Sequence, residues 1–319
     1  METSFSLDGD ASTWDELRWL AAFRDAVRAG DGFHALRAEV FRHTCDVIRR
    51  GSYRVDGDDV HLQEAIPQLG QASFYTRPEP LEVPAQESRV ATTIAVHNAD
   101  CVEVAQLLRL AGLRPAVLNM ANRQTPGGGV LGGAGAQEEN LFRRSDLYVS
   151  LYPFADSCEQ YALVRDKRHS YPLDRRTGGI HSPRVTFFRA SEANGYRLLK
   201  APFSASVITV PAINGPELVI GPEGLRIVDA LVEPTREKIR TILRIAGHHG
   251  HDALVLGAFG CGAFRNPPAH VAELFAEVFR EPEFDGRFRI IDFAILDDHN
   301  SRKSHNPDGN VLPFLRVFG

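Results

Sequence analysis

The chain has 319 residues, of which 43% are hydrophobic and 24% charged, a composition that supports a sizeable core and excludes intrinsic disorder. Its net charge is −5, from 36 Lys and Arg against 41 Asp and Glu, so binding to a nucleic-acid backbone is not expected. No apolar run approaches the ~18 residues of a membrane span, and the polar residues at the start are not expected to act as a signal or transit peptide. The four cysteines are scattered without a CxxC pair, which excludes a zinc ribbon and favours reduced thiols in the cytoplasm, or in the nucleus of a eukaryote.

The first 88 residues are predicted to form a helical extension and a connecting segment. Ser12 or Thr13 is placed to cap a helix over 14–28, and a second helix is expected over 33–50. Residues 51–89 are polar and contain four prolines, which favours irregular structure with at most short strands. We therefore expect 1–88 to pack on a core formed by 89–319.

Strands and helices alternate through the rest of the chain. Strands are expected over 90–97, 115–119, 185–189, 207–211, 253–257 and 289–296. Helices are expected over 101–110, 137–150, 222–246 and 269–280, with irregular structure over 153–183. This alternation predicts an α/β sandwich.

A glycine-rich stretch between the strand over 115–119 and the helix over 137–150 is the most informative segment. Six of the nine residues from 127 to 135 are glycines. Glycine permits positive φ and a close backbone approach, so successive N–H groups can form a concave anion site. The positive end of the following helix would lie at the same place. The stretch predicts a cradle for a phosphate or diphosphate, and a flexible surface loop is the alternative.

Two adjacent carboxylates, Glu138 and Glu139, follow this stretch at the start of the helix. Their simplest role is to complement the helix dipole. Neighbouring helical positions differ by about 100°, so the two side chains can serve different purposes. A carboxylate that faces a bound diphosphate would have a raised pKa, in the range where a general acid works.

Other nucleotide-binding motifs fit the stretch less well. Gly127, Gly129 and Gly132 match GxGxxG, but seven residues separate Asn119 from Gly127 and no strand is expected after Leu151. A dinucleotide-binding turn needs both features. No Lys-Ser or Lys-Thr follows the glycines, so a Walker motif is absent.

The glycines and carboxylates together resemble the signature of poly(ADP-ribose) glycohydrolases. In that signature three glycines, here 127–129, are followed by a spacer and the sequence Gln137-Glu138-Glu139. Residues 140–148 are similar to the compact, microbial-type branch of the family.

Flanking segments extend the resemblance to about 89–296. Residues 117–122 are similar to the strand-to-loop segment of macrodomains, which are ADP-ribose-binding folds. Residues 257–267 resemble the second ligand loop of the microbial-type branch, and 210–214 are similar to the family too. The resemblance implies a macrodomain-like three-layer α/β/α sandwich with a mixed sheet and an N-terminal helical extension.

The resemblance implies hydrolysis of ribose–ribose O-glycosidic bonds in poly(ADP-ribose), with release of ADP-ribose and with no cofactor or metal. It assigns Glu139 as the catalytic acid/base and Glu138 as the residue that holds ribose hydroxyls. Its implied partners are poly(ADP-ribose), ADP-ribose and ADP-ribosylated proteins, without nucleic acid or membrane. The implied substrate-binding residues are Asn119, Asn122, Gly127, Gly128, Gly129, Gln137, Gly260, Cys261, Gly262, Phe264 and Asp100.

Two other functions stay open at this point. A non-catalytic ADP-ribose reader would use both glycine loops but would need no acid at the scissile bond. A mono-ADP-ribosyl hydrolase would cleave at the protein linkage instead.

Some candidate residues have simpler interpretations. Asp100 fits a helix cap, with adenine recognition as the alternative, and Asn119 fits a structural role as well as a ligand contact. Cys261 has no identifiable activating base and is interpreted as a packing residue. Two further clusters, interpreted as solvated or helix-end groups rather than metal sites, are His248, His249 and His251, and Asp297, Asp298 and His299.

Overall fold

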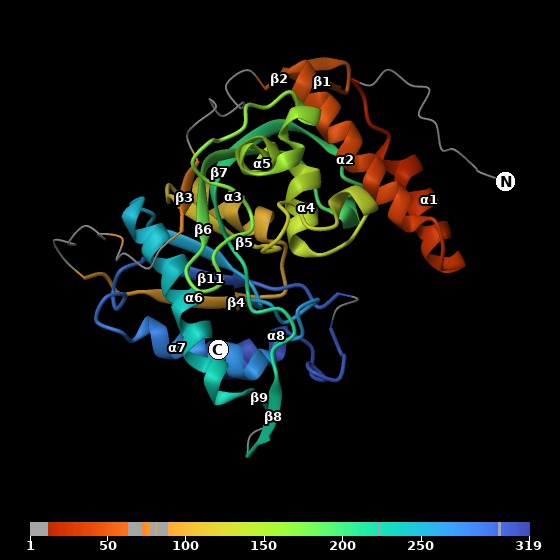
Figure 1. The fold of residues 1–319 in the computed structure, drawn as a ribbon. Coiled ribbons are helices and arrows are strands. Elements are labelled where there is room, and N and C mark those ends of the chain that lie inside the picture. The colour runs from red at the N-terminus through yellow and green to blue at the C-terminus, as the bar shows by residue number, and fades with distance from the viewer. Residues whose placement is uncertain (1–11, 63–71, 77–80, 82–88, 223, 299–300) are drawn as a thin grey trace. The chain divides into compact units, whose positions relative to one another are not determined.

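The structure, a computed structural model, describes residues 12–62, 72–76, 81, 89–222, 224–298 and 301–319 (Figure 1). The chain forms two compact units. One comprises Met1–Leu69, Gly127–Arg165 and Val185–Ser204, and the other comprises Gly70–Pro126, Asp166–Arg184 and Ala205–Gly319. The domain boundary expected at residue 88 lies outside the described residues and stays a prediction.

The first unit begins with two helices and a short hairpin. These elements are α1 (Glu16–Ala29), α2 (Phe33–Arg50), β1 (Ser52–Val55) and β2 (Asp58–His61). The cap of α1 is Asp15, and the prediction of Ser12 or Thr13 was wrong. The Asp15 carboxylate accepts a hydrogen bond of 2.9 Å from the Arg18 N–H, and its charge also suits the positive end of the helix. The second helix has the predicted bounds.

The single helix predicted over 137–150 is two helices, α4 (Gln137–Arg144) and α5 (Leu147–Leu151). Between them, Ser145 has an extended backbone and forms an isolated β-bridge with Phe187. The Asp146 carboxylate accepts a hydrogen bond of 2.8 Å from the Thr186 N–H. Pairing with a distant strand therefore interrupts a helix that local sequence favours.

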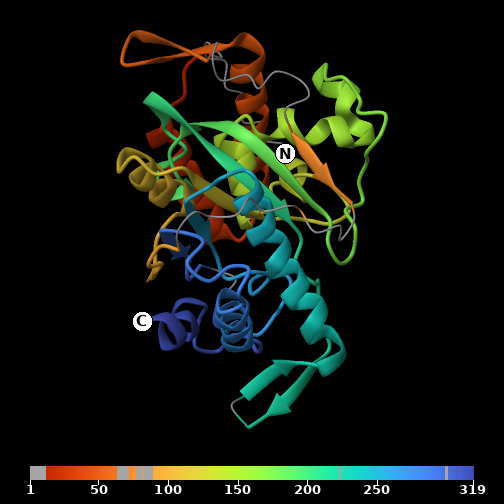
Figure 2. The ribbon, with the colours of Figure 1, turned by 90° about the vertical axis from the view of Figure 1, so that its left-hand side faces the viewer.

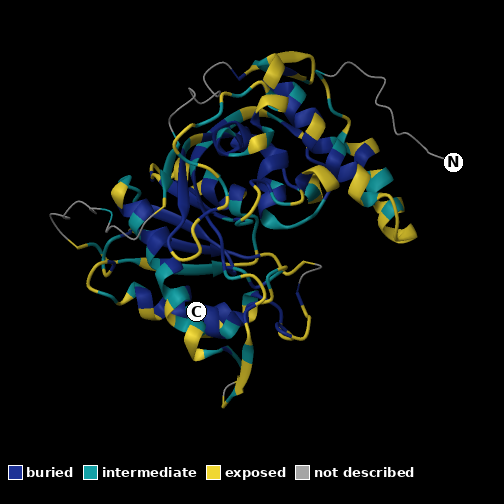
Figure 3. Ribbon diagram, viewed as in Figure 1, coloured by how far each residue is buried: buried dark blue, intermediate teal, exposed yellow. Residues whose placement is uncertain are grey.

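A seven-stranded mixed sheet organises the α/β fold, as predicted. Its strands lie in the order β3 (Ser73–Tyr75), β6 (Gly179–Arg189), β7 (Leu198–Val210), β5 (Pro115–Met120), β10 (Ala253–Leu256), β11 (Ile290–Ala294) and β4 (Thr93–His97). The strands from β7 to β4 pair in parallel, and β3 pairs antiparallel with β6. Figure 3 shows much of the sheet in the dark blue of buried residues. Such burial is typical of parallel sheets covered by helices.

The strands β6 and β7 begin earlier than the sequence predicts. Their N-terminal halves contain polar residues and prolines, and that half of β7 mixes buried, partly exposed and exposed positions. Only the last four residues of β7 form a continuously buried run. The apolar pattern therefore identified only the part of β7 that is buried throughout.

Helices flank the sheet in the second unit. They are α3 (Cys101–Leu110), α6 (Asp229–His248), α7 (Pro268–Phe279) and α8 (Val311–Phe318). On one face, Ala116 and Leu118 of β5 join Leu254 and Leu256 of β10 in a core cluster with α6, α7 and α8. Successive strand residues point to opposite faces, so Val117 lies on the other face, where α3 packs on β5 and β10. Among the helices described, none combines the length and apolar content needed to cross a bilayer.

The helix predicted over 222–246 begins later, at Asp229. The residues before it form a hairpin of β8 (Leu218–Gly221) and β9 (Gly224–Ile227), which Figure 2 shows extending beyond the end of α6. Gly224 opens β9 at a φ of 111°, a conformation that glycine adopts without steric cost. The turn before Gly224 therefore forms a hairpin where the sequence pattern predicts the start of a helix.

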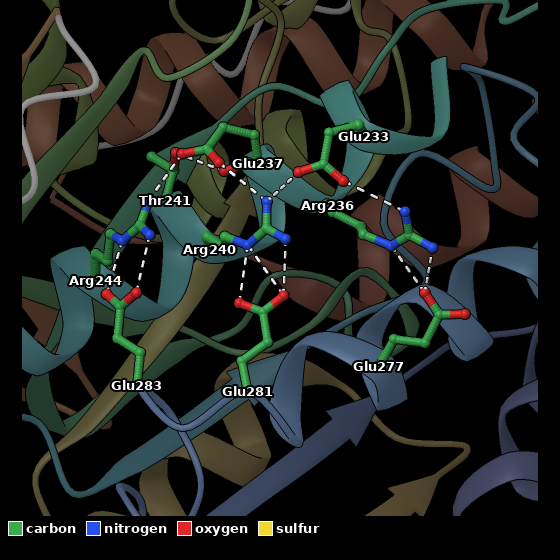
Figure 4. Close-up of polar contacts among 9 residues, drawn as sticks. All are labelled: Glu233, Arg236, Glu237, Arg240, Thr241, Arg244, Glu277, Glu281 and Glu283. Atoms are coloured by element: carbon green, nitrogen blue, oxygen red, sulfur yellow. Dashed lines mark hydrogen bonds and ion pairs between the residues drawn. The ribbon is translucent and has the colours of Figure 1, made fainter. Parts of the chain in front are cut away.

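An ion-pair ladder holds α6 beside α7 and the residues that follow it (Figure 4). Its three rungs, with N–O distances, are Arg236–Glu277 (2.6 Å), Arg240–Glu281 (2.8 Å) and Arg244–Glu283 (2.7 Å). The arginines are spaced by four residues and so share one helix face. Arg240 also pairs with Glu233 and Glu237 of its own helix. Because the side chain of Arg240 is only 16% exposed, solvent screens this network less than isolated surface pairs.

A histidine cluster holds the edge strand β3 in the second unit. The Tyr75 hydroxyl lies 2.7 Å from Nε2 of His249. His181 of β6 stacks on His249 with ring centroids 3.6 Å apart, and its Nε2 lies 3.0 Å from Nε2 of His251. Burial, reinforced by the neighbouring imidazoles, lowers the pKa of His181 to about 2 and that of His249 to about 4. The cluster is therefore built for neutral imidazoles.

This cluster predicts acid-sensitive stability. The folded-state pKa of His181 lies below its ordinary value of 6.5, so the unfolded chain binds more protons between the two values. The contribution of His181 is fully present above pH 6.5 and is lost progressively as the pH falls. Replacement of His181 by Gln should reduce the slope of unfolding free energy against pH by up to about 1.4 kcal/mol per pH unit below that value.

Urea unfolding between pH 4 and pH 8 measures this slope. The same substitution at the exposed His61 of β2, His61→Gln, supplies the matched comparison. A slope that is the same in His181→Gln and in the unsubstituted chain would contradict the assignment.

Candidate functional site

The glycine stretch is a tight loop between β5 and α4. Gly127 and Gly128 have φ angles of 75° and 51°, the region that favours glycine. Close contacts exclude side chains as well. A Cβ on Gly127 would lie 2.6 Å from the Phe142 ring, and one on Gly128 would lie 2.5 Å from Oε1 of Glu139. The glycines are therefore required by the approach of α4, not only by flexibility.

The two glutamates at the start of α4 fold back onto this loop. Both are buried, with Glu138 3% and Glu139 7% exposed. Oε1 of Glu138 accepts a hydrogen bond of 3.1 Å from the Gly127 N–H, and Oε1 of Glu139 accepts one of 2.9 Å from the Gly129 N–H. These two loop amides therefore bind carboxylates of the chain itself.

The second oxygen of Glu139 differs from the first. Oε2 is buried and has no hydrogen-bond partner among the described residues. A buried carboxylate oxygen without a partner is costly and rarely kept without a reason. One oxygen of Glu139 is thus fixed by the backbone, and the other is left to bind a proton or a ligand.

The two asparagines before the loop have structural contacts. Asn119 is fully buried in β5 and donates a hydrogen bond of 3.2 Å from Nδ2 to Oγ1 of Thr209. Oδ1 of Asn122 accepts hydrogen bonds from the N–H groups of Gln124 (2.8 Å) and Thr125 (3.2 Å), which forms an Asx turn. Both residues therefore shape the backbone that leads into the loop.

The second glycine loop, 257–266, is ordered by an asparagine that the sequence reasoning missed. Nδ2 of Asn266 donates to the carbonyls of Ile213 (2.8 Å) and Gly260 (3.1 Å). A Cβ on Gly260 would lie 2.6 Å from Nδ2 of Asn266. Gly262 and Phe264 of this loop are half-buried. No sequence motif pointed to Asn266, whose importance depends on carbonyls brought close by folding.

Cys261 is a packing residue in this loop, as the sequence indicated. It is fully buried, and burial raises the pKa of its thiol, which disfavours the nucleophilic thiolate. Its carbonyl accepts a hydrogen bond of 2.7 Å from Nε2 of His305. The segment before α8 therefore supports the second loop, a role that sequence reasoning also missed.

Asp100 caps α3, as predicted. Its carboxylate accepts hydrogen bonds from the N–H groups of Val102 (3.0 Å) and Glu103 (3.1 Å). Asp297 also has a structural role, since Oδ1 accepts a hydrogen bond of 2.6 Å from the Asn310 N–H just before α8. His299 of the same predicted cluster lies outside the described residues.

The predicted site residues occur in both units. The first unit holds Gly127, Gly128, Gly129, Gln137, Glu138 and Glu139. The second unit holds Asp100, Asn119, Asn122, Gly260, Cys261, Gly262 and Phe264. Within the described ranges, no group of three or more His, Cys, Asp or Glu residues is placed to hold a metal ion.

Comparisons with known proteins agree on one family. Residues 42–190 match the family model of the microbial-type PARG catalytic domain. The solved poly(ADP-ribose) glycohydrolase of Thermomonospora curvata is 35% identical, with a TM-score of 0.69, over 88% of this chain and 99% of that one. Its complex with the inhibitor ADP-HPD gives 34% identity and a TM-score of 0.67 over the same shares.

A second organism supplies a similar structure. The glycohydrolase of Deinococcus radiodurans in complex with ADP-ribose is 31% identical, with a TM-score of 0.59, over 83% of this chain and 98% of that one. No curated protein matches the sequence.

The close approach of Glu139 to the loop predicts that one methyl group added at Gly128 destabilises the fold. Gly128→Ala should destabilise the fold by about 1–3 kcal/mol, because its Cβ would displace the Glu139 carboxylate and its φ is strained for alanine. Gly132 lies in the same loop without a positive φ, and a Cβ there would meet no atom within 4 Å. Gly132→Ala should therefore be neutral or stabilise by up to about 1 kcal/mol. Denaturant unfolding compares the two variants, and equal effects would contradict the contact at Gly128.

Proposed function

Because the chain belongs to the microbial-type poly(ADP-ribose) glycohydrolase family, we propose that it hydrolyses the ribose–ribose O-glycosidic bonds of poly(ADP-ribose) and releases ADP-ribose. One observation carries the catalytic assignment. Glu139 is buried, has Oε1 held by the Gly129 N–H, and has Oε2 without a partner among the described residues. A catalytic acid needs such an arrangement, in which its orientation is fixed and one oxygen stays available.

Glu139 acts first as an acid and then as a base. In its protonated form it donates the proton from one carboxyl oxygen to the departing ribose oxygen as the glycosidic bond breaks. The oxocarbenium-like centre is stabilised by the diphosphate of the ligand itself. The ionised Glu139 then takes a proton from the attacking water, which restores the acid. Proton transfer of this kind contributes about 10²–10⁴-fold to a rate, so orientation and electrostatics supply the rest.

This mechanism uses one carboxylate for proton transfer, whereas most glycosidases use two. Glu138 holds the ribose hydroxyls and orients the scissile bond. Its Oε1 bond to the Gly127 N–H supports this division, because each glutamate is fixed by a different amide of the loop. The glycines 127–129 line the diphosphate and the distal ribose.

The second glycine loop binds the ligand in this proposal. Gly260, Cys261 and Gly262 offer backbone groups to the phosphates, and Phe264 packs against the ribose. The contacts of Asn266 support this role, since they order the loop backbone before any ligand arrives. The family-implied contacts also include Asn119, Asn122, Gln137 and Asp100.

The variant Glu139→Gln tests the assignment of Glu139 as the acid, with poly(ADP-ribose) on an automodified protein as substrate. Glutamine keeps an oxygen for the Gly129 N–H but cannot donate a carboxyl proton. Release of ADP-ribose should fall by about 10²–10⁴-fold, while calorimetric ADP-ribose binding should change little. The exposed Glu159, in the same unit, gives the control, and Glu159→Gln should keep full turnover.

Other outcomes would identify other functions. Full turnover in Glu139→Gln would show that another group is the acid. Loss of ADP-ribose binding together with turnover would make Glu139 a ligand-binding residue. An unsubstituted chain that binds ADP-ribose but releases none from polymer would be a reader, and one that releases only the protein-linked unit would be a mono-ADP-ribosyl hydrolase.

We also propose a cytoplasmic location. Cys45, Cys158 and Cys261 are free thiols, and all three are buried. Thiols stay free in reducing compartments, where disulfides are rare.

A further inference from the structure

We propose that a hydrogen-bonded relay of Arg37, Glu192, Tyr196 and Arg143 positions the glycine loop and, through it, the carboxylate of Glu139. The relay begins on the N-terminal helix α2 and ends on α4, and all of its members belong to the first unit. Its residues are positioning residues, since none of them reaches a reacting atom. The effect on turnover rests on the proposed function, whereas the effect on the loop does not.

Arg143 forms the link between the relay and the loop. It lies four residues after Glu139 on α4, so both side chains share one side of the helix. Nη1 of Arg143 donates a hydrogen bond of 2.8 Å to the Ala134 carbonyl, while Glu139 accepts from the Gly129 N–H. These two bonds attach both ends of the 129–134 segment to the same helix.

The guanidinium of Arg143 is itself held by few contacts. Nε donates a hydrogen bond of 2.8 Å to the Tyr196 hydroxyl, and the guanidinium lies 5.6 Å from the Tyr196 ring. Nη2 is buried and has no hydrogen-bond partner among the described residues. The orientation of the fully buried Arg143 therefore depends strongly on the Tyr196 hydroxyl.

The Tyr196 hydroxyl also contacts Glu192, so it connects Arg143 to that carboxylate. The hydroxyl donates a hydrogen bond of 2.9 Å to Oε2 of Glu192 while it accepts from Arg143. Arg37 then holds Glu192 in a two-pronged ion pair, with Nε and Nη2 each 2.7 Å from a carboxylate oxygen. Burial tends to raise the pKa of Glu192, but the hydrogen bond and charge of Arg37 outweigh it, and the pKa is lowered. Glu192 is therefore ionised and binds Arg37 strongly.

The helix that carries Arg37 also touches the loop directly. A Cβ on Gly135 would collide with the Arg37 guanidinium, and one on Gly133 would collide with the His34 carbonyl. Nδ1 of His34 lies 3.0 Å from the Gly133 carbonyl oxygen. The C-terminal half of the loop is thus held from outside by α2, in addition to its bonds to α4.

The relay explains why the N-terminal helices accompany this loop. A buried charge that loses its partner is strongly unfavourable, so each member of the relay keeps the next in place. Loss of Arg37 would leave Glu192 without its cation, loosen the Tyr196 hydroxyl and free Arg143 to turn away from Ala134. The Gly129 amide, and with it Oε1 of Glu139, would then lose its fixed position.

The test compares Arg37→Met with Arg37→Lys on poly(ADP-ribose). Misplacement of a catalytic group by a distant change can cost up to about 100-fold, so Arg37→Met should lower kcat about 10- to 100-fold with KM changed less than about threefold. Arg37→Lys keeps one charged donor and should restore part of kcat. The control is Arg49→Met on the same helix, whose exposed ion pair with Asp46 lies within α2, and which should keep normal kcat.

Hydrogen exchange tests the loop without relying on turnover. Arg37→Met should speed amide exchange over 127–136, including the Gly129 N–H, while β5, β10 and β11 keep their protection. Tyr196→Phe removes only the hydroxyl between Arg143 and Glu192 and should have the same two effects, so it replaces Arg37→Met if that variant fails to fold.

Two results would overturn the relay. One is unchanged loop exchange in both variants. The other is a loss of total activity that matches the loss of folded protein, so that kcat per folded molecule is unchanged. If the unsubstituted chain releases no ADP-ribose but the loop loosens in the two variants as described, the proposed function fails and the relay stands.

Discussion

The organisation of the candidate site depends on a backbone loop that folds back onto the helix following it. The Gly127 and Gly129 N–H groups donate to Glu138 and Glu139, so two adjacent carboxylates are fixed by two nearby amides. This geometry requires that no side chain stand at Gly128, because a Cβ there would lie 2.5 Å from Oε1 of Glu139. These two hydrogen bonds and the close approach at Gly128 thus join the glycine loop to the acidic pair.

The two glutamates place carboxylates in the interior of the first unit, which also contains buried arginines. Arg143, Arg144 and Arg189 are each no more than 1% exposed. Arg189 donates to Thr44 (2.9 Å) and, from Nη1, to the Tyr196 carbonyl (3.0 Å). A buried ion pair is weak evidence for stability compared with apolar packing, and in some proteins its role is to select one arrangement over others. Of these three arginines, Arg143 contacts the glycine loop, through its hydrogen bond of 2.8 Å to the Ala134 carbonyl.

The second unit shows a different use of charge. Its ion-pair ladder joins α6 to α7 and the residues that follow α7 at partly exposed positions, where it complements an apolar core rather than replacing it (Figure 4). Its second glycine loop is ordered by hydrogen bonds from Asn266 and His305 to carbonyls. The two loops thus reach an ordered backbone by different physical means, charge in one unit and amide or imidazole donors in the other.

The sequence by itself determined the features whose causes are local. Apolar periodicity and the flanking glycines gave α2 its predicted bounds, and the carboxylate of Asp100 identified a helix cap. The family resemblance of 127–129 and Gln137-Glu138-Glu139 pointed to the acidic pair. Only the tertiary structure decided the features that join distant residues. Strand pairing interrupts the helix at Ser145, and Arg37 meets Glu192 across 155 positions of the chain. The reason is physical: periodicity and capping act within a few residues, whereas buried hydrogen bonds form between groups that only folding brings together.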